Sequence, residues 1–107
     1  MKNSVNVANN IKTIEILKAE ALQNMAGLFN RMAAEPGPDT RDRLASDFAG
    51  LIAVTYLLAR RLGYGYGEIN ENILKKLDRG IASGDTPERD FKDLSELRKY
   101  IRIAGKE

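Results

Sequence analysis

The stretch that most constrains the fold of this chain is FAGLIAVTYLL, residues 48–58, where apolar side chains would surround a helix on almost every side. A helix without a polar face in its middle is normally the most buried helix of its protein. A chain of 107 residues forms one domain with one core, and has little material left to cover such a helix. We therefore expect a central helix over about 41–62, and a homodimer or homotetramer in which a second copy completes its burial.

The first helix follows from apolar residues at three- and four-residue steps. We expect it over about 7–33, with one apolar stripe formed by Ile14, Leu17, Ala21, Met25, Leu28 and Met32. The segment EPGPDT, residues 35–40, should separate it from the second helix, because two prolines around a glycine cannot continue a helix. Asp39 or Thr40 is expected to cap the second helix.

Two further helices are expected in the second half of the chain. The third would run from Gly65 or Gly67 to about Gly80. The last would begin with a capping box at Asp93 and Glu96, after the linker SGDTPERD, whose TPE resembles a short helix start. No segment predicts a strand. The expected fold class is therefore all-α, with four helices in a single domain over residues 1–107.

The glycine-rich stretch GYGYG, residues 63–67, has two interpretations. A phosphate-binding loop of the dinucleotide type follows a strand and has the spacing G-x-G-x-x-G. Here the stretch follows an expected helix and has the spacing G-x-G-x-G. Gly63 suits the left-handed position just after a helix end, with Arg60 and Arg61 favourably placed in the last turn. We therefore interpret the stretch as a connection between two helices.

Composition excludes several kinds of chemistry. The chain contains no cysteine and no histidine, so any metal would be a hard cation bound by oxygen ligands. The formal net charge of +2 is too small to indicate nucleic acid as a partner. The apolar run over 51–59 is far shorter than the roughly 20 residues of a membrane span. The N-terminus also lacks the apolar core of a signal peptide, so we expect a cytoplasmic protein without membrane contact.

Each of the first two helices carries a second face beside the expected core. Glu20 and Gln23 share such a face on the first helix, and Asp47, Gly50 and Val54 share one on the second. If the two helices are antiparallel, Glu20 and Asp47 could offer carboxylates to one Mg²⁺. The alternative is that both are solvated charges on helix surfaces, and spacing alone favours that alternative.

Two segments resemble a known family. SDFAGLIAVTYLLARRLGYGYGEINENILKKLDRGI, residues 46–81, resembles the third and fourth helices of the MazG-type all-α NTP pyrophosphohydrolases. NIKTIEILKAEALQNMAGLF, residues 10–29, is similar to the N-terminal helix of the MazG-like subgroup. The resemblance implies a four-helix MazG-like fold whose bundle is completed by oligomerisation. It also implies Mg²⁺-dependent cleavage of a nucleoside triphosphate to a monophosphate and pyrophosphate.

The resemblance further implies a metal site with missing ligands. Family members hold the cation with an E-x-x-E pair on one helix and an E-x-x-D pair on the next. Glu20 matches the first glutamate and Asp47 the third acid, whereas Gln23 and Gly50 replace the other two. Gln23 retains a carbonyl oxygen, but Gly50 has no side chain. We therefore expect weak Mg²⁺ binding at most.

Two basic residues extend the resemblance to phosphate. Lys76 and Arg79 match basic positions that follow the acidic motifs in the family, and they could contact phosphate oxygens. The alternative is ordinary solvated charge on an amphipathic helix, which the spacing alone favours.

Three functions are compatible with these residues. The first is a MazG-like nucleotide- or partner-binding module whose pyrophosphohydrolase activity is weak or absent. The second is an active pyrophosphohydrolase whose missing ligands come from Asp42, Glu15 or a neighbouring subunit. The third is a helical nucleic-acid binder, which is least favoured because acidic residues nearly balance the basic ones. It would use Arg60, Arg61, Lys75, Lys76 and Arg79.

Overall fold

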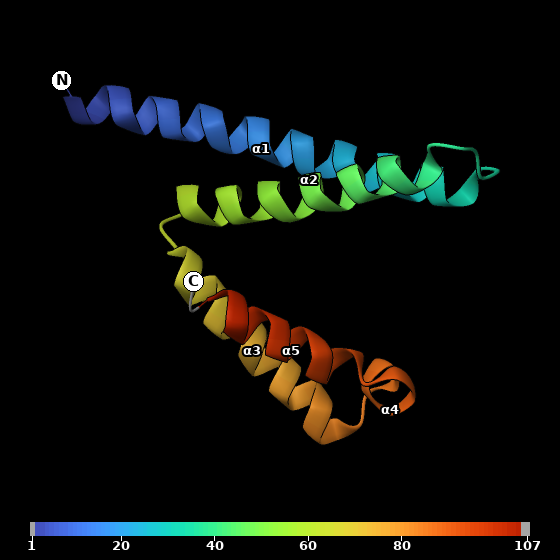
Figure 1. Ribbon diagram of the computed structural model, residues 1–107. Coiled ribbons are helices and arrows are strands. Elements are labelled where there is room, and N and C mark those ends of the chain that lie inside the picture. Colours follow the sequence, from blue (N-terminus) through green and yellow to red (C-terminus); the bar gives the residue numbers. More distant parts are fainter. Residues whose placement is uncertain (1, 106–107) are drawn as a thin grey trace. The chain divides into compact units, whose positions relative to one another are not determined.

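The computed structural model describes the backbone of residues 2–105 and the side chains of residues 7–105. The described part contains helices and no strand, which confirms the all-α fold class (Figure 1). There are five helices over this range rather than four, because TPERDF forms a short helix of its own. They are α1 (Lys2–Ala33), α2 (Thr40–Arg61), α3 (Tyr66–Ser83), α4 (Thr86–Phe91) and α5 (Asp93–Ala104).

The helices form two compact units, Met1–Tyr64 and Gly65–Glu107. In the first unit, α1 and α2 pack side by side as an antiparallel hairpin (Figure 1). In the second unit, α3 and α5 pack against each other and α4 lies at one end of the pair. Each unit is therefore built from one antiparallel pair of helices.

The α1–α2 interface follows alternating steps of three and four residues, as in antiparallel coiled coils. Leu17, Leu28 and Val54 are its buried apolar residues, each contributing about 1.5–3 kcal/mol by burial. The residues at these steps, all buried or half-buried, are Asn10, Ile14, Leu17, Ala21, Asn24, Leu28 and Arg31 of α1, with Leu44, Asp47, Leu51, Val54 and Leu58 of α2. Gly50 of α2 also faces α1.

Polar residues within this interface correct the expected apolar stripe of the first helix. Met25 and Met32 were expected in the core, but they are 40% and 60% exposed. Asn24 and Arg31, each one residue earlier in the chain, occupy the half-buried positions instead. A prediction based on apolar residues alone is therefore wrong by one residue at these two turns of α1.

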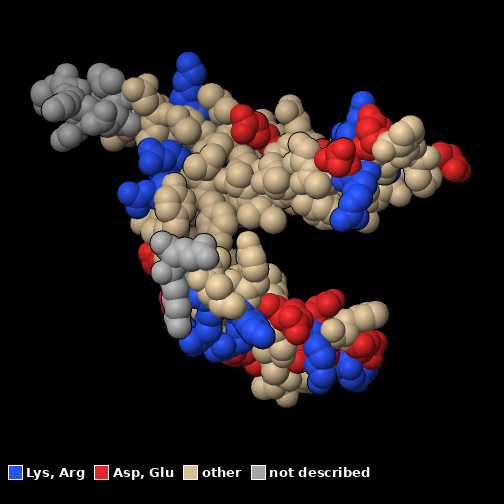
Figure 2. All heavy atoms as spheres, viewed as in Figure 1, with Lys and Arg blue, Asp and Glu red and all other residues tan. Residues whose placement is uncertain are grey.

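The apolar ring of the second helix is covered on one side within its unit. Val54 is 3% exposed, whereas Phe48, Ile52 and Leu57 are 48%, 59% and 47% exposed. Figure 2 shows mostly uncharged side chains over the middle of this hairpin, on the face in view. α1 therefore covers α2 on one side only, and the expectation that a second copy completes the burial of α2 stays a prediction.

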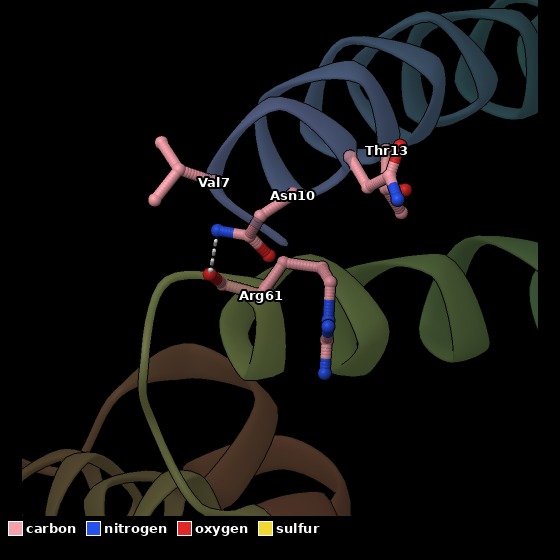
Figure 3. A pocket seen from close by; sticks show the side chains of 5 residues that line it. Val7, Asn10, Thr13 and Arg61 are labelled. Atoms are coloured by element: carbon pink, nitrogen blue, oxygen red, sulfur yellow. Dashed lines mark hydrogen bonds between the residues drawn. The ribbon is translucent and has the colours of Figure 1, made fainter. Parts of the chain in front are cut away.

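The two ends of the hairpin are fixed by polar contacts. At the open end, the Asn10 side-chain amide donates to the backbone carbonyl of Arg61, at 3.1 Å (Figure 3). This contact satisfies a carbonyl that the last turn of α2 leaves unpaired. At the closed end, residues 34–39 are non-helical, as EPGPDT predicts. Asp39 is the N-cap residue of α2, as one of the two expectations had it, but its carboxylate makes no capping bond and pairs with Arg43 instead. The Thr40 hydroxyl accepts from the Gly37 N–H.

The glycine-rich stretch is a helix connection, which confirms its interpretation. Gly63 has φ +99°, a left-handed conformation that glycine adopts without cost. The N–H groups of Gly63 and Tyr64 donate to the carbonyls of Arg60 and Ala59, closing a Schellman-type ending. Gly65 precedes α3, and its N–H donates to the Glu68 carboxylate at 3.2 Å.

The third helix ends later than expected. It continues through Gly80 to Ser83, and Gly84 takes the left-handed position with φ +68°. Gly80 is instead a packing glycine, because a β-carbon there would lie 2.6 Å from Leu94 Cδ1 of α5. The absence of a side chain at Gly80 therefore allows α5 to approach α3 closely.

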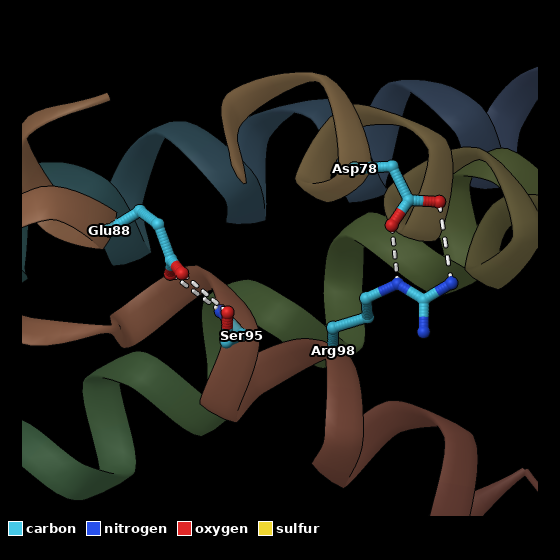
Figure 4. Close-up of polar contacts among 4 residues, drawn as sticks. All are labelled: Asp78, Glu88, Ser95 and Arg98. Carbon is cyan, nitrogen blue, oxygen red and sulfur yellow. Dashed lines mark hydrogen bonds and ion pairs between the residues drawn. The ribbon is translucent and has the colours of Figure 1, made fainter. Parts of the chain in front are cut away.

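The junction between α4 and α5 depends on Glu88 rather than on the expected capping box. Asp93 lies inside α5, and Lys92 precedes it in the left-handed conformation with φ 61°. The Glu88 carboxylate, on a residue only 6% exposed, accepts from the Ser95 N–H at 2.9 Å and from its hydroxyl at 2.5 Å (Figure 4). Both bonds lower the pKa of Glu88, and the bond from the Ser95 hydroxyl has the larger effect. A carboxylate from α4 thus caps the first turn of α5.

Candidate functional site

An ion pair joins the two helices of the α1–α2 interface. Arg31 Nε donates to Asp47 Oδ2 at 2.7 Å. The two side chains are 33% and 17% exposed, so the pair is partly withdrawn from water. The hydrogen bond to Asp47 raises the pKa of Arg31, which keeps the guanidinium charged. Asp47, a candidate metal ligand, therefore already holds a cationic partner.

Gly50 lies beside this pair, one turn further along α2. It faces α1, because a β-carbon at Gly50 would lie 3.2 Å from Asn24 Nδ2. The expectation that Asp47, Gly50 and Val54 lie on a face separate from the core is therefore wrong, since that face is the α1–α2 interface. The sequence pattern did not identify this face as part of the core, because both helices carry polar residues at interface positions.

Glu20 and Gln23 are exposed on α1. The Asn24–Gly50 contact sets the register of the antiparallel hairpin. Glu20 precedes Asn24 on α1, and Asp47 precedes Gly50 on α2. Because the helices are antiparallel, the two acids lie on opposite sides of this contact, about 10 Å apart along the helix axes at a rise of about 1.5 Å per residue. The structure therefore brings Gln23 near the level of Gly50, but it does not bring Glu20 beside Asp47 in one hairpin.

The residues at the four motif positions do not fit Mg²⁺ within a single chain. Over the part that the structure describes, no three acidic, histidine or cysteine side chains converge as a group that could hold a metal. Mg²⁺ requires near-octahedral oxygen ligands at about 2.1 Å. Asp47 is paired with Arg31, and Gly50 contributes no oxygen. The assignment of Glu20 and Asp47 as metal ligands stays a prediction.

The other candidate residues lie on exposed helix surfaces. Lys76 and Arg79 are exposed on α3 in the second unit. Of the substitute ligands considered, Glu15 pairs with Lys18 at 3.2 Å, and Asp42 is exposed in the first turn of α2. None of these side chains has a geometry that identifies a bound group.

A shallow hollow with polar and apolar lining near the open end of the hairpin was not predicted from the sequence. It measures about 460 Å³ and is lined by Val7, Asn9, Asn10, Thr13 and Arg61 (Figure 3). The Asn10 amide is engaged by the Arg61 carbonyl, while the Arg61 side chain extends away from that contact. Neither periodicity nor the family motif singles out these asparagines.

Comparison with known proteins identifies the class to which this all-α fold belongs. The profile of the MazG-like family matches residues 7–94, which includes all of the described first unit except its N-terminal turn, and most of the second. The chain therefore belongs to the MazG-like family, as the two resembling segments predicted. No curated protein and no solved structure matches the chain. A search of the described helices finds none with the length and apolarity needed to cross a membrane.

Proposed function

We propose that this protein is a MazG-like nucleotide- or partner-binding module with weak or absent NTP pyrophosphohydrolase activity. The observation that supports the proposal is the loss of carboxylates at the motif positions, where Gln23 and Gly50 replace two acids. The affinity of a hard cation depends on the number and charge of its oxygen ligands. Metal-assisted hydrolysis needs that cation to neutralise phosphate charge and to position water. With so few carboxylates at the motif positions, any Mg²⁺ bound there would retain several waters and be held weakly.

The second part of the proposal is a homodimer or homotetramer. Large apolar residues remain exposed along both helices of the first unit, and contiguous apolar surface of this kind marks interaction sites. A second hairpin packed against them would complete a four-helix bundle. The residues concerned are Leu22, Met25, Phe29 and Met32 of α1, with Phe48 and Ile52 of α2.

The third part concerns ligand binding. Lys76 and Arg79 are exposed on one helix at a three-residue spacing, so both can reach the same phosphate group. We propose them as phosphate contacts within a single MazG-like domain, since the family match covers both units.

The proposal is tested with wild-type protein, Mg²⁺ and each standard nucleoside triphosphate, by measuring pyrophosphate release. We expect release far below ordinary enzyme rates of about 1 s⁻¹ or faster. In parallel, binding of a non-hydrolysable triphosphate is measured for wild type, for Lys76→Ala/Arg79→Ala, and for the matched control Lys99→Ala on α5. The double variant should lose affinity and the control should not. Turnover at ordinary enzyme rates would refute the reduced-activity part of the proposal.

A further inference from the structure

The Arg31–Asp47 ion pair differs from the other ion pairs of the first unit. Lys18–Glu15 and Arg43–Asp39 are local pairs, three and four residues apart, with every side chain more than half exposed. Arg31 and Asp47 are sixteen residues apart and join α1 to α2. Their lower exposure reduces screening by water, so their attraction is stronger than that of a surface pair.

The position of this pair is informative because Asp47 occupies an acidic position of the family motif. A carboxylate binds a divalent cation more weakly when a fixed positive charge beside it competes for its oxygens. In this chain, Asp47 Oδ2 points at a guanidinium 2.7 Å away. Arginine cannot lose its proton in a protein, so the competing charge does not disappear at any physiological pH.

We propose that Arg31 supplies, from within the chain, the positive charge that a divalent cation would supply at Asp47, and that it thereby closes this carboxylate to metal. The inference rests on the proposed loss of the metal site and names the residue that replaces the metal. It also explains how the Asp47 carboxylate, only 17% exposed, is tolerated in the interface. The guanidinium neutralises it and ties α2 to α1 at the same point.

The inference is tested by titrating the full chain with Mn²⁺ and measuring the electron paramagnetic resonance signal of the free ion. Mn²⁺ is used because, like Mg²⁺, it is a hard cation that prefers oxygen ligands. The proteins compared are wild type, Asp47→Asn, Arg31→Met, Arg31→Met/Asp47→Asn and Arg31→Lys. Arg43→Met is the matched control, because it removes a guanidinium from an exposed pair on the same hairpin.

We expect wild type, Asp47→Asn and Arg31→Lys to bind Mn²⁺ equally weakly. Arg31→Met should bind it at least about tenfold more tightly, since a positive charge beside the carboxylate is gone. The gain should vanish in Arg31→Met/Asp47→Asn and be absent in Arg43→Met. Circular dichroism of each variant checks that the helices are retained.

Three results would overturn the inference. The first is Mn²⁺ binding by wild type that Asp47→Asn abolishes, a comparison that holds even if Arg31→Met fails to fold. The second is no gain in Arg31→Met, and the third is a gain that Asp47→Asn does not remove or that Arg43→Met equals. Rapid pyrophosphate release that survives Asp47→Asn would refute the proposed function while leaving this inference standing, so the two can fail separately.

Discussion

Asn24 of α1 faces Gly50 of α2 so closely that a β-carbon at Gly50 would lie 3.2 Å from Asn24 Nδ2. The contact places Gly50, which the family resemblance matches to the final acid of the motif, inside the α1–α2 interface. Restoring an acid at Gly50 therefore requires the Asn24 amide to move, which the sequence did not reveal.

This contact predicts different effects for two helical glycines. Gly27→Ala should raise the free energy of unfolding by about 0.5–1 kcal/mol, because alanine favours helix and no atom lies within 4 Å of the new β-carbon. Gly50→Ala should gain less, because its β-carbon meets Asn24. Gly50→Asp should lower stability, and Asn24→Ala should relieve part of that loss. Urea unfolding measures all four variants. Equal gains for Gly27→Ala and Gly50→Ala would contradict the packing described here.

The exposed apolar side chains of α2 predict self-association. Light scattering at micromolar concentration should give the mass of a dimer or tetramer for wild type. Ile52→Asp should shift the protein towards monomer, because an unpaired carboxylate would be buried in the interface between copies. Leu97→Asp is the control, since Leu97 is an exposed apolar residue on α5 of the second unit. A stable wild-type monomer would count against the proposed oligomer.

Glu88 predicts a pH dependence of stability. Its pKa is lower in the folded protein than its ordinary value near 4.5, because the Ser95 hydroxyl and N–H donate to the ionised carboxylate. The unfolded state therefore binds more protons in this range, so the stabilisation is fully present above the ordinary value. It is lost as pH falls from there through the folded pKa.

The corresponding experiment compares Glu88→Gln with the exposed matched variant Glu96→Gln. The difference in unfolding free energy between wild type and Glu88→Gln should be largest near neutral pH and should shrink as pH falls below about 4.5. Glu96→Gln should show a smaller difference at neutral pH. A Glu88→Gln difference that grows on acidification would have the wrong sign for a carboxylate stabilised in its ionised form.

The turn between α1 and α2 predicts the first site of proteolysis. Residues 34–39 are non-helical and exposed, whereas only residues 84–85 separate α3 from α4. Limited digestion with proteinase K should therefore cut within 34–39 before it cuts within 44–62. Mass spectrometry of the first fragments identifies the site. Initial cleavage inside α2 would mean that this helix opens more readily than its connection.

Much of the local structure could be predicted because it depends on local chemistry. The prolines of EPGPDT end a helix wherever they occur, and Gly63 is suited to a left-handed position by its lack of a side chain. Three- and four-residue spacing indicated the main helices, and two helical segments were sufficient to indicate the MazG-like family. Spacing first suggested Glu20 and Asp47 as ligands while favouring solvated surface charge, and the family resemblance then matched both residues to acidic positions of its motif.

Other features depended on which residues meet across the hairpin. Asn24 and Arg31 replace apolar residues in the interface, so hydrophobicity pointed to Met25 and Met32 instead. Gly80 and Gly84 both lie near the end of α3, and either could have ended the helix. In the structure Gly80 packs against Leu94 of α5, and Gly84 is the residue at which α3 ends.

The sequence by itself determined the four main helical segments, most of the breaks between them and the family, because these follow from backbone preferences and from side-chain pattern along one helix. Only the tertiary structure decided that Asp47 is held by Arg31 and that Gly50 faces Asn24. Both contacts depend on the register of two antiparallel helices, and a shift of one turn along either helix would give each of these residues a different partner.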